Sequence, residues 1–168
     1  FRCQTEIISI SDALCGYDLT IHTPKRSRND TVEFLHYPVL FAPVVGTQER
    51  QGGSWHNPEE LARTMTILER LLIGGIGPEE IAVITPYRAQ LYALRKAMLL
   101  RHLPIEPSVE MQEFEETSRS SRTGIALGTV HRFQGGERSV VLFTSVVTDP
   151  HSLPFINDRV NLLNVAVS

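Results

Sequence analysis

The sequence predicts a single α/β domain built around a mainly parallel sheet. Three observations favour this class: an amphipathic helical pattern at 57–75, a short run rich in β-branched residues at 81–85, and a long apolar run at 139–147. Strands without polar alternation are typical of a parallel sheet that helices cover on both faces. The 168 residues, 42% of them hydrophobic, are enough for one domain with its own core.

The first helical pattern begins at Asn57, a good N-cap residue, and Pro58 suits the first turn. Glu60 stands three residues after the cap, which predicts a capping box and places a carboxylate at the positive end of the helix. Apolar residues then recur on one face until Gly74 and Gly75, which are typical of a helix end. An amphipathic helix is therefore predicted here.

Strands and a second helix complete the predicted sheet. The run 81–85 is expected to be a strand buried on both faces, and the helix after it has leucine and methionine on one side. The segments 125–130 and 139–147 are predicted to be two further strands. An additional strand is expected at 39–45, where Pro43 interrupts it.

Two polar tracts, 18–31 and 110–123, are predicted to be mobile surface loops. The chain starts at Phe1 rather than Met and stops at Ser168, so we expect it to be part of a longer protein. It shows no secretory leader and no apolar run of membrane-spanning length, and a cytoplasmic location is expected.

Charge and cysteine content exclude several kinds of site. The net charge of -3 and the pI near 6.1 give no overall basic footprint, so any nucleic-acid contact must use local groups or a companion domain. Cys3 and Cys15 form no CxxC pair and have no histidine at ligand spacing, so no metal site is predicted. A P-loop, a GxSxG elbow, HExxH and GxGxxG are also absent from the sequence.

Polar residues gather where the predicted strands end, which is where open α/β sheets bind ligands. The segment 85–90, Thr-Pro-Tyr-Arg-Ala-Gln, follows one strand, and the segment 128–137, Gly-Thr-Val-His-Arg-Phe-Gln-Gly-Gly-Glu, joins two others. Gly135 and Gly136 permit close backbone approaches that a side chain would block. These two segments form the candidate ligand-binding edge.

Five motifs in this order resemble the second motor domain of superfamily 1 helicases, in the branch that includes the nonsense-mediated decay helicase, and their form is similar to bacterial members. They are an aromatic-Arg motif at 1–4, a Ser-x-x-Asn-x-x-Glu helix start at 54–60, motif IV at 85–90, motif V at 128–137 and the opening of motif VI at 164–168. The resemblance covers nearly the whole chain. It implies a RecA-like, P-loop-NTPase-type fold of three layers that lacks its own P-loop.

In that family ATP and Mg lie between two RecA-like domains, and the N-terminal domain of the same polypeptide supplies the P-loop and the metal site. The second domain senses the γ-phosphate through arginine, whose fork of donors matches phosphate oxygens. The resemblance implies that the catalytic residues are Arg2, Arg88 and Gln134. Those implied to bind the nucleotide are Phe1, Tyr87, Gln90, Gly135 and Glu137, and those implied to hold the strand are Thr85, Pro86, Thr129, His131 and Asn164.

The implied function is ATP-driven movement along single-stranded nucleic acid, with DNA favoured over RNA and a 5′ to 3′ direction. The first arginine of motif VI would follow Ser168, and the P-loop is absent, so this chain alone is expected to hydrolyse no ATP. Two alternatives stay open. One is an inactive RecA-like module that binds nucleic acid or protein, and the other is a free-standing Rossmann-like enzyme.

Overall fold

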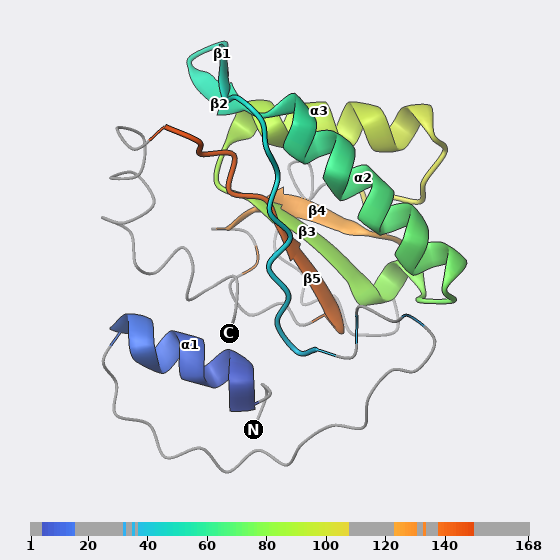
Figure 1. The fold of residues 1–168 in the computed structure, drawn as a ribbon. Coiled ribbons are helices and arrows are strands. Elements are labelled where there is room, and N and C mark those ends of the chain that lie inside the picture. The colour runs from blue at the N-terminus through green and yellow to red at the C-terminus, as the bar shows by residue number, and fades with distance from the viewer. Residues whose placement is uncertain are drawn as a thin grey trace.

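The computed structural model describes residues 5–15, 32, 35, 37–107, 123–130, 133 and 138–149. Its helices and strands, in chain order, are α1 (Thr5–Cys15), β1 (Glu49–Gln51), β2 (Ser54–His56), α2 (Pro58–Ile73), a short 3-10 helix (Pro78–Glu80), β3 (Ile81–Thr85), α3 (Arg88–Leu100), β4 (Ala126–Thr129) and β5 (Val140–Phe143). Figure 1 shows β3 at the centre, with α2 and α3 beside the sheet and the β1–β2 hairpin near the start of α2.

The strands β4, β3 and β5 form one parallel sheet with β3 in the middle. Every residue of β3 is buried, as expected for a central strand. Because side chains alternate along a strand, Ile81 and Val83 pack on the face that meets α2 and α3, whereas Ala82 and Ile84 pack on the opposite face. The parallel sheet confirms the predicted α/β class and is consistent with a RecA-like domain.

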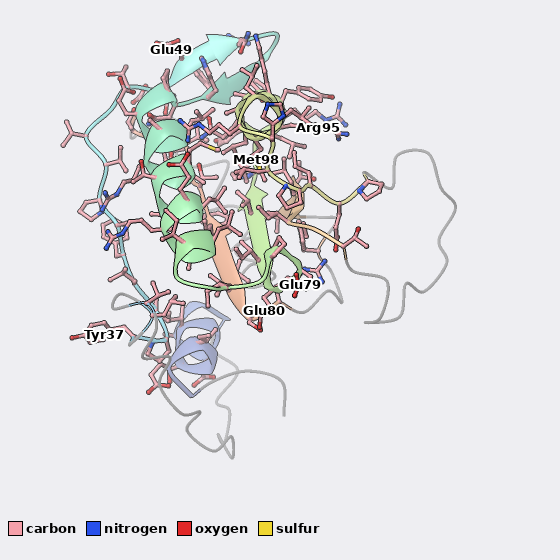
Figure 2. The ribbon with its side chains drawn as sticks, turned by 90° about the vertical axis from the view of Figure 1, so that its right-hand side faces the viewer. Tyr37, Glu49, Glu79, Glu80, Arg95 and Met98 are labelled. Atoms are coloured by element: carbon pink, nitrogen blue, oxygen red, sulfur yellow. The ribbon has the colours of Figure 1, made fainter. Side chains whose placement is uncertain are left out.

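The amphipathic helix predicted after Asn57 is α2. Its inner side carries Met65, Leu68 and Leu71, which are fully buried in the same core cluster as Leu94 of α3. This spacing of three residues places the side chains on one face of the helix. Figure 2 shows α2 running alongside the sheet. The prediction is therefore confirmed for the helix and for the face that it buries.

The predicted strand at 39–45 is wrong. The segment lies in an extended path beside α2 (Figures 1 and 2), but it joins no sheet, and Val45 is 99% exposed. Proline lacks a backbone N–H group, so Pro43 removes a donor that a ladder would need in the middle of this segment, and Pro38 removes another just before it. The apolar residues of this segment therefore do not form a strand of a sheet.

Two other strands are shorter than predicted. β4 covers 126–129 of the expected 125–130, and Ile125 makes only an isolated bridge with Ile105. β5 stops at Phe143, whereas the apolar run continues to Val147. The N–H of Thr144 still bonds to the carbonyl of Ile84 in β3, but the N–H groups of Ser145 and Val146 bond to the Glu60 side chain instead of a neighbouring strand.

The antiparallel hairpin of β1 and β2 was not predicted from the sequence. Arg50 pairs with Trp55 across it, and Gly52 and Gly53 form its turn with φ values of 56° and 79°. Two positive φ angles in a two-residue turn match the twist of a hairpin, and glycine adopts them without strain. The Gly-Gly pair between two short polar segments is the sequence signal for this element.

Several predictions concern residues outside the described ones. These include the loop 18–31, the loop 110–123 apart from Thr123, and the opening of motif VI at 164–168. Among the described helices, none is long and apolar enough to cross a membrane. The described residues also contain no group of three or more His, Cys, Asp or Glu that could hold a metal ion. One domain for residues 1–168 stays a prediction.

Candidate functional site

The carboxyl ends of β3 and β4 bring two of the predicted strand-binding residues together. Thr85 and Thr129 are direct partners in the parallel register, so their backbones lie about 4.8 Å apart, the usual spacing of neighbouring strands. The Thr129 side chain is half-buried. The Thr85 side chain is fully buried, and its hydroxyl accepts a hydrogen bond from the N–H of Tyr87 at 3.4 Å. Thr129 is thus the more accessible of the two hydroxyls.

A buried polar network lies directly behind this edge. The N–H of Asn57 donates to Oε1 of Gln90 at 3.0 Å, and Nε2 of Gln90 donates to Oγ1 of Thr144 at 3.1 Å. Asn57 is 2% exposed and Gln90 is 0% exposed. The network therefore joins the start of α2, the start of α3 and the end of β5, and Gln90 uses its polar groups inside the protein rather than at the surface.

Glu60 connects α2 to the chain that leaves β5. Its Oε1 accepts the N–H of Ser145 at 2.8 Å, and its Oε2 accepts the N–H of Val146 at 2.7 Å. Hydrogen bonds to an ionised acceptor are among the strong ones in proteins. Two backbone donors that lost their ladder partners at the end of the strand are satisfied in this way.

The predicted capping box is therefore only half right. The expected bond from the N–H of Glu60 to Oδ1 of Asn57 is present at 3.0 Å. The reciprocal bond is replaced, because the N–H of Asn57 bonds to Gln90 and the Glu60 carboxylate bonds to Ser145 and Val146. Hydrogen bonds to residues that are distant in sequence thus replace the reciprocal bond between Glu60 and Asn57 that the local sequence predicted.

Val146 sits at the centre of these contacts in an unusual backbone conformation. It is fully buried and has a φ of 71°, in the left-handed region. That region costs a residue with a Cβ about 1–2 kcal/mol, and a β-branched residue is rarely found there. Its N–H bonds to Glu60, and its carbonyl accepts from Nδ2 of Asn57 at 3.4 Å. Two partners on α2 thus hold the strained turn.

Gln48 satisfies the backbone donors a little further along the same segment. Its Oε1 accepts the N–H groups of Thr148 and Asp149 at 3.0 Å and 3.2 Å. Its own N–H donates to Oγ1 of Thr148 at 3.1 Å. The chain from Ser145 to Asp149 is therefore attached by side chains of Glu60 and Gln48, and not by a fourth strand.

Burial raises the pKa of the Glu60 carboxyl above its ordinary value of 4.5. Hydrogen bonds from the Val146 N–H, the Thr144 hydroxyl and Ser145 offset only part of this rise. Burial likewise raises the pKa of Tyr87, whose phenol stays neutral. Glu60 is the described carboxyl whose protonation is coupled to the structure of this corner.

This coupling predicts a pH dependence of stability. The folded state binds the Glu60 proton more tightly than the unfolded state does, so the contribution of Glu60 is most favourable below pH 4.5. It is lost progressively as the pH rises from there through the raised folded pKa. We expect the free energy of unfolding of Glu60→Gln, measured by urea titration across this range, to depend less on pH than that of the unsubstituted chain. Identical pH profiles would contradict the assignment.

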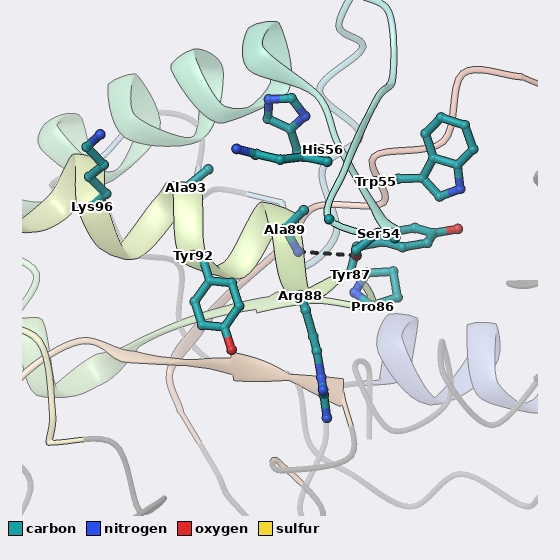
Figure 3. Close-up of a pocket in the computed structure, with 13 residues that line it drawn as sticks. Ser54, Trp55, His56, Pro86, Tyr87, Arg88, Ala89, Tyr92, Ala93 and Lys96 are labelled. Atoms are coloured by element: carbon teal, nitrogen blue, oxygen red, sulfur yellow. Dashed lines mark hydrogen bonds between the residues drawn. The ribbon is translucent and has the colours of Figure 1, made fainter.

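A surface pocket of about 1190 Å³ lies between the hairpin and the first turns of α3. Figure 3 shows the bond that ties the two walls together: Oγ of Ser54 accepts the N–H of Ala89 at 3.2 Å. This bond satisfies a donor in the first turn of α3, where the N-cap residue Tyr87 makes no side-chain cap. The pocket is lined by Gln51, Gly52, Gly53, Ser54, Trp55, His56, Pro86, Tyr87, Arg88, Ala89, Tyr92, Ala93 and Lys96.

Three predicted site residues line this pocket. They are Pro86, Tyr87 and Arg88, and Arg88 is exposed at the start of α3. Two others, Thr85 and Gln90, are fully buried behind it, so neither side chain contacts a ligand directly in this conformation. The predictions for Phe1, Arg2, His131, Gln134, Gly135, Glu137 and Asn164 lie outside the described residues.

The residues that support this edge from behind were not predicted from the sequence. Glu60 and Thr144 meet only because α2 and the end of β5 lie together in the fold, and no local pattern connects them. The remaining pocket residues had a usable signal. Arg88, Tyr92 and Lys96 are spaced four residues apart, which places them on one side of a helix.

A family model described as an AAA domain matches residues 1–168. The chain is 29% identical over 150 residues to the putative helicase mov-10-B.1 of Danio rerio, a match that covers 84% of this chain and 13% of that protein. It is 30% identical over 134 residues to the regulator of nonsense transcripts 1 homolog of Drosophila melanogaster, covering 78% and 10%. It is 30% identical over 115 residues to the RNA helicase Mov10l1 of Mus musculus, covering 66% and 8%. The chain thus spans roughly a tenth of the length of these relatives.

Proposed function

Because the chain belongs to the AAA domain family, we propose that it is the second, RecA-like motor domain of an ATP-dependent superfamily 1 helicase of the nonsense-mediated decay type. Two of the relatives are named as helicases and a third as a regulator of nonsense transcripts, which supports this proposal. An N-terminal RecA-like domain of the same polypeptide supplies the P-loop and the Mg site. The ATP-dependent helicase activity of that whole polypeptide is likewise proposed.

The observation that carries the proposal is the register of Thr85 with Thr129. The starts of the two segments that resemble motif IV and motif V thus lie side by side at the carboxyl edge of a parallel sheet, which supports the proposal. Ligands of open α/β sheets bind at this edge. The half-buried hydroxyl of Thr129 then holds the phosphodiester of a strand, while buried Thr85 fixes the turn that leads to Tyr87.

Arg88 is the described residue that best fits a nucleotide phosphate. It is exposed, it begins α3, and its permanent charge suits a phosphate presented from outside the domain. ATP bound with Mg supplies the phosphoryl group whose cleavage drives the motor. Arg2, Gln134 and Glu137 keep the roles that the resemblance implies. This chain by itself, without a P-loop, is expected to hydrolyse no ATP.

We propose RNA as the strand, in place of the DNA that the sequence favoured. Two relatives have names that state a nucleic-acid substrate, and in both names it is RNA: the RNA helicase Mov10l1 and the 3′-5′ exoribonuclease HELZ2, both of Mus musculus. Contacts to the backbone do not read sequence, so they suit movement along any RNA. A 5′ to 3′ direction, a cytoplasmic location and a bacterial origin stay predictions.

A strand-binding titration tests the proposal. Fluorescence anisotropy of labelled uridine and deoxythymidine oligonucleotides is measured with the chain and with Thr129→Val, which removes one hydroxyl at almost constant shape. A lost hydrogen bond to a charged phosphate should weaken binding about tenfold or more. Thr66→Val is the control, because Thr66 is exposed on α2 and its hydroxyl bonds only to the carbonyl of Ala62. Equal affinities for both variants would remove Thr129 from the strand face, and no binding by the unsubstituted chain would refute its strand-binding role.

A further inference from the structure

The outer side of α3 carries a regular stripe of exposed side chains. Arg88, Tyr92, Lys96 and Leu100 follow each other at intervals of four residues, so they lie one above the other along the helix. Tyr92 is 61% exposed, although it is a large aromatic residue. The inner side of α3 is buried in the core, and Figure 2 shows Met98 toward the sheet and Arg95 toward the outside.

Two hollows adjoin along this stripe. The first is the pocket of about 1190 Å³ beside the hairpin, and the second, of about 470 Å³, lies further along α3. Tyr92 and Lys96 line both hollows. Arg88, Arg95 and Lys96 contribute cations, and no Asp or Glu is found among the described residues that line either hollow. The surface is therefore locally basic in a chain whose net charge is -3.

We propose that this stripe binds single-stranded nucleic acid, with a base stacked on the Tyr92 ring and a neighbouring phosphate at Lys96. The inference rests on the proposed function, and it adds a contact surface on α3 beyond the carboxyl edge of the sheet. Stacking on an aromatic ring tolerates any base, and a cation beside it holds the backbone. Tyr92 and Lys96 line both hollows, so a strand that occupies the hollows would contact both side chains.

Position favours a nucleic acid over an acidic peptide as the occupant. Pro86 lines the first hollow and directly follows Thr85 at the carboxyl edge. The hollow therefore begins one residue from Thr85, whose partner in the sheet is Thr129, at the edge proposed to hold the strand. Tyr92 and Lys96 lie about 6 Å apart along the helix axis. That spacing of an aromatic ring and a cation suits a base and a neighbouring phosphate of one strand, whereas Arg88 remains the proposed contact of the nucleotide phosphate.

Trp55 provides a direct signal of occupancy. It is the single tryptophan of the 168 residues, and it lines the first hollow. The guanidinium of Arg50 lies 5.9 Å from the centroid of its ring. A strand that enters this hollow changes the surroundings of the indole, so we expect its fluorescence emission to change on binding.

The experiment titrates the chain with three probes: a uridine oligonucleotide, an abasic ribose-phosphate oligonucleotide of equal length, and a poly-glutamate peptide. We expect the uridine oligonucleotide to change Trp55 emission and Tyr92→Ala to weaken its binding about tenfold. Tyr92→Ala should leave binding of the abasic probe unchanged. Lys96→Ala should weaken both oligonucleotides and lower the salt dependence of binding by about one phosphate contact.

Arg63→Ala is the matched control for Lys96→Ala, since it removes one exposed cation from α2 outside both hollows. Unchanged affinity in Tyr92→Ala and Lys96→Ala, together with weaker binding in Thr129→Val, would overturn the stripe and leave the proposed function standing. Absence of binding to either oligonucleotide would overturn both. A stronger response to poly-glutamate than to the uridine oligonucleotide would identify an acidic-peptide site and overturn the inference.

Discussion

Glu60→Ala is expected to lower the free energy of unfolding by about 2–4 kcal/mol. The change removes both acceptors of the Ser145 and Val146 N–H groups, and Val146 is fully buried. A buried donor left without a partner costs its full desolvation penalty. The strained backbone of Val146 also loses one of the two partners that hold it. Urea unfolding followed by far-UV circular dichroism measures the effect.

The control for this prediction is Glu59→Ala. Glu59 is an exposed neighbour in the first turn of α2, so both variants lose one negative charge near the same helix end. The difference between them reports the hydrogen bonds of the Glu60 carboxylate to the Ser145 and Val146 N–H groups and to the side chains of Thr144 and Ser145. If both variants lost the same small amount of stability, the bonds from Ser145 and Val146 to Glu60 would contribute nothing beyond charge at the helix end.

Gln90→Leu is expected to be the second large change, with a loss of about 2–3 kcal/mol. Leucine has a similar size but leaves the buried N–H of Asn57 without an acceptor and the Thr144 hydroxyl without a donor. The motif resemblance assigned Gln90 to the nucleotide. If Gln90 only contacted the nucleotide, its substitution would change the affinity for nucleotide and leave the free energy of unfolding unchanged. The variant therefore separates a nucleotide-binding role from a structural role.

Thr144→Val is the companion variant, because it removes the acceptor of the Gln90 amide and the hydroxyl donor to Glu60 but keeps the bond between Gln90 and Asn57. We expect it to cost less than Gln90→Leu. The double variant should cost less than the sum of the two single changes, since both remove the same Gln90–Thr144 bond. Additive losses would show that this pair is not coupled.

The parts of the fold that sequence could predict are those set by local patterns. The period of α2 and the β-branched run of β3 are visible within a few residues, and the structure confirms both. The apolar runs at 39–45 and after Phe143 look similar to β3 in composition. They are not strands, because a segment joins a sheet only where a neighbouring strand offers backbone N–H and C=O groups for pairing. The composition of the segment does not show whether such a neighbour is present.

The candidate site shows the same division. The segment 85–90 could be placed at a strand end, since a strand that stops before proline is a local signal. The pairing of Thr85 with Thr129 and the bond between Glu60 and Val146 join residues far apart in the chain. Their geometry follows from how α2, α3 and the sheet pack, so it could not be predicted from spacing. The structure also separated exposed Arg88 from buried Gln90, which the motif had grouped together.

The attachment of Ser145–Asp149 through Glu60 and Gln48 has a consequence for how this segment varies among related chains. Four of its backbone N–H groups meet carboxylate or amide oxygens, and a backbone donor is the same for every residue type except proline. Substitutions that avoid proline keep these donors. An inserted or deleted residue shifts all of them relative to their acceptors. Length is therefore the property that the segment must conserve, and side-chain identity matters at buried Val146 and at Ser145 and Thr148, whose hydroxyls also make hydrogen bonds.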